Sequence, residues 1–273
     1  MWKHIAWVLA CLPGLVLVDP SAQAGQAGAE EPPLYDSTVD TVFDIIQLSD
    51  PSTFSCLQYT GRGDRQIWDK RVEDEPVVNA FLFVARYDDG TNIEIAINPE
   101  YDTKENARAE ALRFAKPLGQ LPTLLRQGVH RFSVHRGEKG FHAGTGHVIV
   151  YAGTADRRTD ADHLEESLFH EAVHASLDED HRLSDGWKEA QAKDGRFLTE
   201  YAQRSPERED LAETALFAYG ILFYPDRFPP ADTDDTLAAV PNRIEYIKRL
   251  LPPDQPIVSR VGDTAPCGPD AEF

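Results

Sequence analysis

The sequence has few cysteines and lacks the short motifs of several large enzyme classes. Three cysteines occur in 273 residues, and none forms a C-x-x-C pair, which argues against a thiol redox enzyme. The patterns G-x-S-x-G, G-x-x-x-x-G-K-[ST] and G-x-G-x-x-G are also missing. The sequence therefore gives no support to a nucleophile-elbow hydrolase, a P-loop NTPase or a dinucleotide-binding enzyme.

Positive charge is scarce as well. Lysine and arginine total 27 against 46 aspartates and glutamates, so the formal net charge is −19. A surface this acidic repels phosphate backbones and anionic membranes, so we expect no binding of nucleic acid. The excess of acidic residues also keeps a secreted protein soluble. For a substrate, it indicates only a mild preference for basic or neutral molecules.

Long apolar runs are confined to the first two dozen residues. A short basic start precedes the apolar stretch 5–18, and the string SAQA at 21–24 is a small-x-small pattern. These features are typical of a secretory signal peptide, residues 1–24, cleaved after Ala24. The stretch is shorter than the ~20 residues of a membrane span and contains Pro13, so we expect no stable membrane insertion. The predicted location is secreted or periplasmic.

The two cysteines that follow this segment, Cys56 and Cys267, flank the part of the chain expected to fold. In an oxidising compartment, cysteines so placed are expected to join in a disulfide that ties the ends together. The chain between them is long enough to bury one full hydrophobic core. We therefore expect a flexible linker over 25–36, a single domain over 37–250 and a Pro-rich tail over 251–273.

Hydrophobic periodicity places the strands before most of the helices. A hairpin is expected over 77–98, with its turn at Asp88-Asp89-Gly90. Further strands are expected at 129–137 and 147–153, on either side of a glycine-rich rim over 137–146. Helices are expected at 37–50, 102–116, 162–178, 184–194, 206–222 and 236–250. This order predicts an α+β fold, with a small mixed or antiparallel sheet followed by a mostly helical half.

The string His170-Glu171-Ala172-Val173-His174 has the spacing of a zinc site. Residues four apart are neighbours on one face of a helix, so both imidazoles point at one metal ion. Glu171 lies about 100° around the helix, where it reaches a metal-bound water without becoming a ligand. The spacing predicts one Zn²⁺ ion, with Glu171 as the general base.

The rest of the expected helix favours a metal site over a buried structural helix. His163, Ser167 and Asp178 share one side with the two histidines, whereas leucines and alanines occupy the other side. A purely structural helix needs no such stripe of polar groups. Asp178 follows His174 by four residues, so it is a candidate to hold that imidazole from behind.

A third ligand must come from elsewhere, because a catalytic zinc ion takes three protein ligands and keeps one position open. In the helix expected over 206–222, Glu209 and Glu213 stand four residues apart on a face that is otherwise apolar. Carboxylates on a buried face are costly unless they are paired or bound to metal. One of the two is therefore expected to bind the metal and the other to hold an imidazole N–H. The spacing alone leaves this choice open.

The segment 146–225 resembles zinc peptidases related to the catalytic domain of anthrax lethal factor, within the zincins that add a glutamate to HExxH. The likeness rests on HEAVH and on FLTEYAQRSPEREDLAET, in which a tyrosine precedes a Glu-x-x-x-Glu helix. The resemblance implies a zincin-like fold with Glu209 as the third zinc ligand. It also implies that Tyr201 stabilises the oxyanion, and that the strand at 147–153 is an edge strand that pairs with an extended peptide or protein substrate.

The sequence thus predicts a secreted zinc metallopeptidase with its catalytic core at about 146–225. Two other interpretations stay open at this point. One is a zinc amidase that acts on cell-wall or modified peptides, because HExxH chemistry suits any amide. The other is a non-catalytic binding module in which zinc is structural, closed by a fourth ligand such as His181 or Glu213.

Overall fold

A mixed six-stranded sheet organises the residues that the computed structural model describes, which are 31–41, 43–269 and 271. The predicted signal peptide and the first part of the predicted linker lie outside these described residues. The strand order is β1-β2-β3-β4-β6-β5. The strands are β1 (Phe54–Gln66), β2 (Val77–Tyr87), β3 (Asn92–Ile97), β4 (Arg131–His135), β5 (His142–Gly144) and β6 (His147–Tyr151).

The pairing of the strands explains where the core lies. β1, β2 and β3 form an antiparallel meander, β4 runs parallel to both β3 and β6, and β5 is antiparallel to β6. One row of paired positions across four strands is apolar and buried, and it consists of Phe83, Ile95, Phe132 and Val148. Such cross-strand contacts stabilise a sheet. The predicted combination of a mixed sheet with many helices is confirmed.

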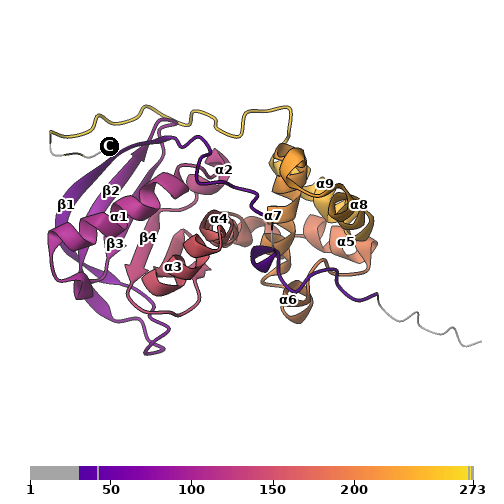
Figure 1. Cartoon of the computed structure of the whole chain (residues 1–273), viewed down its shortest axis with the longest axis horizontal. Helices are drawn as coiled ribbons and strands as arrows, with labels where there is room; N and C mark the ends of the chain where they lie inside the picture. The colour runs from indigo at the N-terminus through magenta and orange to yellow at the C-terminus, as the bar shows by residue number, and fades with distance from the viewer. Residues whose placement is uncertain (1–30, 42, 270, 272–273) are drawn as a thin grey trace, which may run out of the picture. The chain divides into compact units, whose positions relative to one another are not determined.

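Helices cover one face of this sheet and continue beyond it (Figure 1). The helix expected over 102–116 forms as α1, which lies over the sheet, and the Thr103 side chain caps it by accepting a hydrogen bond from the Asn106 N–H. The helices near the sheet are α1 (Lys104–Leu118), α2 (Thr123–Arg126), α3 (Ala152–Asp160) and α4 (Leu164–Leu177). Those that follow are α5 (Asp185–Asp194), α6 (Glu200–Arg204), α7 (Asp210–Phe223), α8 (Pro230–Ala239) and α9 (Pro241–Leu250).

Short helical turns complete the list: η1 (Thr38–Asp40), η2 (Pro99–Tyr101), the π-helical turn η3 (Asp178–Arg182) and η4 (Pro225–Arg227). The helix predicted over 37–50 is wrong, because only η1 forms there. The irregular chain after η1 buries both Ile45 and Ile46 in the core, and side chains bind the backbone of these two residues. The Glu166 carboxylate accepts the Ile46 N–H, and Arg227 donates to the Ile45 carbonyl oxygen.

Two other helices differ from their predicted limits. The single helix expected over 236–250 is two helices, α8 and α9, because Pro241 has no N–H to continue α8 and begins α9 instead. The helix expected from residue 206 begins at Asp210, with Glu209 at its N-cap position. No pattern in the sequence indicated α3 or α6.

The edge of the sheet is not where we expected it. β6 lies between β4 and β5, so the prediction of an edge strand at 147–153 is wrong. Four of the five residues of β6 are buried, which fits an interior strand packed on both faces. The edge position belongs to β5, which lies inside the segment predicted to be a glycine-rich rim.

Both ends of the described chain are tied to the fold. The predicted disulfide between Cys56 and Cys267 is present, with a Cα–Cα distance of 6.2 Å. The tail before Cys267 lies along the sheet, where the Val261 N–H donates to the Asp89 carbonyl oxygen (2.8 Å). At the other end, Tyr35 pairs with Thr199 in a parallel bridge, so this end of the predicted linker is part of the fold. No helix of the described residues is long and apolar enough to cross a membrane.

Candidate metal centre

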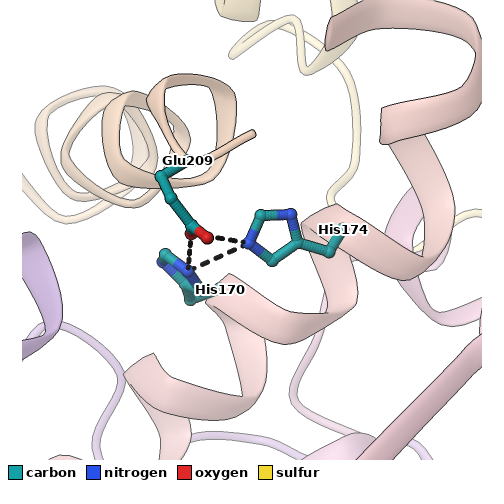
Figure 2. A group of neighbouring side chains, drawn as sticks. All are labelled: His170, His174 and Glu209. Atoms are coloured by element: carbon teal, nitrogen blue, oxygen red, sulfur yellow. Dashed lines mark hydrogen bonds and ion pairs between the residues drawn. The ribbon is translucent and has the colours of Figure 1, made fainter. Parts of the chain in front are cut away.

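Two buried imidazoles and one buried carboxylate converge between α4 and α7 (Figure 2). His170 and His174 are one turn apart on α4, and Glu209 comes from the start of α7. The His174 Nε2 atom lies 3.1 Å from His170 Nε2 and 3.1 Å from Glu209 Oε2, and His170 Nε2 lies 3.4 Å from the same oxygen. Among the described residues, this is the one group of three or more potential ligands with such close contacts.

The geometry of this group fits a zinc ion. Bonds of 2.0–2.1 Å in a tetrahedral arrangement separate neighbouring ligand atoms by about 3.3 Å, close to the three distances observed here. The Nδ1 atom of His174 lies 2.9 Å from Asp178 Oδ2 and donates its proton to that oxygen. The Nε2 lone pairs and the Glu209 oxygen then all point at one place, which is favourable only if a cation lies among them.

The charges around His174 and Glu209 support this interpretation. Burial lowers the pKa of His174, but its hydrogen bonds with Asp178 and Glu209 outweigh burial and raise the pKa to about 10. Burial raises the pKa of Glu209, but hydrogen bonds from both histidines outweigh it and hold the pKa below its ordinary value. The other Glu209 oxygen lies 3.2 Å from Arg208 Nε. The Glu209 side chain is therefore an ionised carboxylate, and its negative charge attracts a cation to the space between the two histidines.

Glu213 holds His170 from behind instead of joining the ligand atoms. Its Oε1 atom lies 3.4 Å from His170 Nδ1, on the far side of the ring from Glu209. This contact is not a hydrogen bond, and no other described residue donates to or accepts from this buried nitrogen. Glu213 itself is fully buried. The sequence did not decide between Glu209 and Glu213. In the structure Glu209 lies close to the Nε2 atoms of both histidines, whereas Glu213 and Asp178 each face the second nitrogen of one histidine.

A buried ion pair fixes the start of α7, where Glu209 lies. Asp210 pairs with Arg243 of α9, and Arg243 Nε also donates to Asp194 at the end of α5 (2.9 Å). The Asp210 carboxylate further accepts a hydrogen bond from Gln191 (2.8 Å). All three charged side chains are fully buried, so removing one would leave an uncompensated charge. This network joins three helices and thereby sets the position of the neighbouring Glu209.

Glu171 and Tyr201 line the same cavity as the three ligand residues. The cavity has a volume of about 950 Å³. Burial raises the pKa of Glu171, and the two neighbouring histidines partly oppose that effect. Burial, followed by the charge of Glu209, raises the pKa of Tyr201 well above its ordinary value, so its hydroxyl keeps its proton. The structure therefore brings a carboxyl group and a protonated phenol hydroxyl into the cavity that His170, His174 and Glu209 line.

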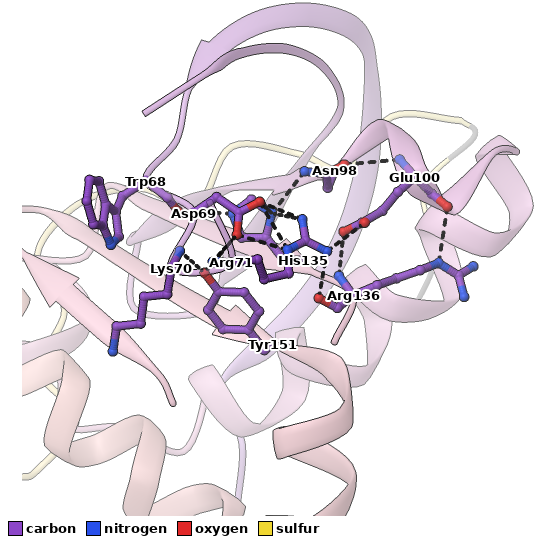
Figure 3. Close-up of polar contacts among 9 residues, drawn as sticks. All are labelled: Trp68, Asp69, Lys70, Arg71, Asn98, Glu100, His135, Arg136 and Tyr151. Carbon is purple, nitrogen blue, oxygen red and sulfur yellow. Dashed lines mark hydrogen bonds and ion pairs between the residues drawn. The ribbon is translucent and has the colours of Figure 1, made fainter. Parts of the chain in front are cut away.

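A loop between β1 and β2 forms another wall of this cavity through Trp68 and Lys70. Figure 3 shows the buried His135 that anchors the loop. Its Nε2 atom donates to the Trp68 carbonyl oxygen (3.1 Å), and its Nδ1 atom accepts from the Asn98 amide (2.9 Å). Both ring nitrogens are used in this tautomer, so His135 acts as a structural histidine. Consistent with this, burial lowers its pKa.

Lys70 carries positive charge into the cavity. The Tyr151 hydroxyl accepts the Lys70 backbone N–H (2.6 Å), as Figure 3 shows. The Lys70 ammonium group donates to the Phe141 carbonyl oxygen (2.7 Å). Burial lowers the pKa of Lys70, although the nearby carboxylate of Glu171 acts in the opposite direction. Neither Trp68 nor Lys70 was expected from the sequence, because about a hundred residues separate them from His170.

His181 and His163, which the sequence also offered near the motif, lie outside the group. His181 Nδ1 lies 2.8 Å from the Tyr246 hydroxyl. His163 is at the N-cap position of α4. The two residues named as a closing fourth ligand, His181 and Glu213, thus have other neighbours.

Comparisons with protein-family models, with curated protein sequences and with solved structures found no match to this chain. Evidence for the function therefore comes from the residues of the site.

Proposed function

We propose that this chain is a secreted or periplasmic zinc metallopeptidase that hydrolyses peptide bonds. One observation carries the proposal: His170, His174 and Glu209 converge in a cavity that Glu171 and Tyr201 also line. Three ligands with an adjacent proton acceptor are the arrangement of a catalytic zinc site with one open position. A structural zinc site would use a fourth protein ligand. The two candidates for it have other partners: His181 contacts Tyr246, and Glu213 accepts hydrogen bonds from Ser37 and Thr38.

A bound Zn²⁺ ion would polarise the scissile carbonyl group and lower the pKa of a water molecule, so that the water loses a proton readily and becomes a strong nucleophile. Glu171 takes the proton of the attacking water and then delivers it to the leaving amine. The raised pKa of Glu171 suits this exchange, because a carboxyl group whose pKa lies nearer neutrality both accepts and returns a proton. Tyr201 donates its hydroxyl proton in a hydrogen bond to the oxygen on which negative charge develops.

An extended substrate is expected to pair with β5. This strand forms the open edge of the sheet, and its residues line a cavity of about 400 Å³ together with His174 and Asp178. Main-chain hydrogen bonds to such an edge hold a peptide extended and place successive side chains on alternate faces. A peptide paired with β5 would therefore run next to His174, one of the proposed metal ligands.

The test is the Glu171→Gln variant, which keeps the shape of the side chain and removes its basicity. We expect about one zinc ion per chain in both proteins by elemental analysis, and a loss of hydrolysis of about 10²- to 10⁴-fold in the variant. Glu105→Gln on the exposed surface of α1 is the matched control and should behave as the wild type. Cleavage products of casein, of a mixed peptide library and of cell-wall peptides are identified by mass spectrometry.

Equal rates for wild type and Glu171→Gln would disprove the mechanism. If the zinc-loaded wild type cleaves none of the three substrates, the peptidase proposal fails. If it cleaves only cell-wall peptides, the function is that of a zinc amidase.

A further inference from the structure

The chain segment before β1 lies beside the metal centre, although it is far in sequence from the HEAVH motif. Residues 34–36 pair with the chain just before and within α6, where the Glu200 N–H donates to Tyr35 O (2.8 Å) and the Tyr201 N–H donates to Asp36 O (3.0 Å). The segment therefore runs directly alongside the backbone of Tyr201. This pairing delivers the next two residues, Ser37 and Thr38, to the interior.

Ser37 and Thr38 bind both oxygens of one buried carboxylate. The Ser37 hydroxyl donates to Glu213 Oε1 (2.9 Å), and the Thr38 backbone N–H donates to Glu213 Oε2 (2.8 Å). Ser37 is 7% exposed, Thr38 1% and Glu213 0%. Because water does not reach this carboxylate, the two donors fix both its position and the direction of its oxygens.

The same Glu213 oxygen that accepts from Ser37 lies 3.4 Å from Nδ1 of His170. At this distance Glu213 makes no hydrogen bond with Nδ1, but its negative charge favours a proton on Nδ1 and so leaves the Nε2 lone pair free for a metal ion. Ser37 is thus the outermost member of a chain of contacts that runs through Glu213 to His170. On the other side of the centre, Asp178 holds His174 without help from this segment.

The segment also shapes the space beside the site. Asp36, Ser37, Val39 and Asp40 form one wall of a cavity of about 320 Å³, and Glu171 and Tyr201 line the same cavity. The segment therefore lies against the proposed catalytic residues as well as behind a proposed metal ligand.

We infer that Ser37 is a positioning residue of the metal centre, which raises metal affinity by fixing Glu213 against His170. The inference rests on the metal binding of the proposed function, but not on hydrolysis. Outer partners of this kind change metal affinity by about 10- to 100-fold when they are removed. The effect of Ser37 is expected at the lower end of that range, because the Thr38 N–H still binds Glu213 when the hydroxyl is lost.

The experiment titrates zinc into the metal-free protein against a chromophoric chelator. Ser37→Ala should raise the zinc dissociation constant about 10-fold, whereas Ser37→Thr, which keeps the hydroxyl, should restore tight binding. Ser52→Ala is the matched control, because it also removes a serine hydroxyl that donates to an oxygen, here the Lys116 carbonyl, away from the metal centre. Circular dichroism of the metal-free proteins reports whether each variant is folded.

A double-mutant cycle with Glu213→Gln separates positioning from general loosening of the fold. If Ser37 acts through Glu213, then Ser37→Ala should weaken zinc binding much less in the Glu213→Gln background than in the wild type. Wild-type affinity in Ser37→Ala, an equal loss in Ser52→Ala, or strictly additive effects in the cycle would each overturn the inference. A wild type that binds zinc but hydrolyses no peptide removes the proposed function and leaves this inference standing. A wild type that binds no zinc removes both.

Discussion

The Nε2 atoms of His170 and His174 face each other at 3.1 Å, and Oε2 of Glu209 lies 3.1 Å from the same His174 nitrogen. Two imidazole nitrogens come this close only if a cation or a shared proton lies between them, because their lone pairs otherwise repel. The raised pKa of His174, about 10, means that a proton takes this position when no metal is bound. A metal ion and a proton therefore compete for the same place.

This competition predicts that zinc binding releases protons. At pH 7.5, well below the His174 pKa of about 10, the metal-free protein carries a proton on His174 that zinc must displace. Calorimetric titration in buffers of different ionisation enthalpy should give a release of about one proton per zinc ion. Asp178→Asn should lower the pKa of His174 and reduce that release. Zinc binding without any proton release at pH 7.5 would mean that His174 is already neutral.

Glu209, at the N-cap position of α7, and Glu213, within α7, should differ sharply in their effect on metal binding. Glu209→Ala removes the carboxylate that lies close to both histidines, so zinc affinity should fall by more than it does in Glu213→Gln. Glu213→Gln keeps a hydrogen-bond acceptor beside His170 and should cost about 10-fold. Equal losses in the two variants, measured by competition with a chelator, would contradict the placement of Glu209 at the metal position.

The sequence was sufficient for the part of the site that depends on local geometry. His170, Glu171 and His174 follow from the four-residue spacing of one helix, and the same spacing places Asp178 behind His174. The hairpin of β2 and β3 was equally local, since its turn residues and its alternating strands are adjacent in the chain. In each case the relevant physics lies within a few residues.

The parts of the site and fold that the sequence did not predict depend on contacts between residues far apart in the chain. Ser37 meets Glu213 across 176 positions of sequence, and neither residue carries a motif that names the other. The error at 37–50 has a similar cause. Its apolar spacing suits a helix, but Glu166 binds the Ile46 N–H and so holds the backbone in an irregular path. The edge position of β5 also depends on the order of strands in the sheet, which a three-residue strand does not indicate.

Glu166 should make the stability of the fold depend on pH. Burial raises the pKa of this carboxyl group to about 8, although the Ile46 N–H partly opposes the rise. Because the folded pKa lies above the unfolded value, the stability that the neutral group contributes is complete below about pH 4.5. It is lost progressively as the pH rises to about 8, by an amount on the order of 4 kcal/mol.

Glu166→Gln should remove that loss, so the variant should gain stability relative to the wild type as the pH rises from 5 to 8. Urea unfolding at several pH values measures this difference, and subtraction of the two curves cancels groups that titrate in both proteins. Glu189→Gln on the exposed side of α5 is the control and should follow the wild type. Parallel curves for wild type and Glu166→Gln would show that Glu166 does not titrate in this range.

The disulfide should stabilise the fold without contributing to metal binding. Cys56 and Cys267 are 211 positions apart, so their bond restricts nearly the whole unfolded chain, with an upper limit of about 5 kcal/mol in the chain-entropy view. The tail that Cys267 anchors hydrogen-bonds to Asp89 and Thr123, neither of which lines the metal cavity. Replacing both cysteines by serine should therefore lower the free energy of unfolding by roughly 2–5 kcal/mol, while the zinc dissociation constant stays unchanged. Urea unfolding of the wild type with a thiol reductant should reproduce the double variant. A loss of zinc affinity in the folded variant would instead mean that the tail supports the metal centre from a distance.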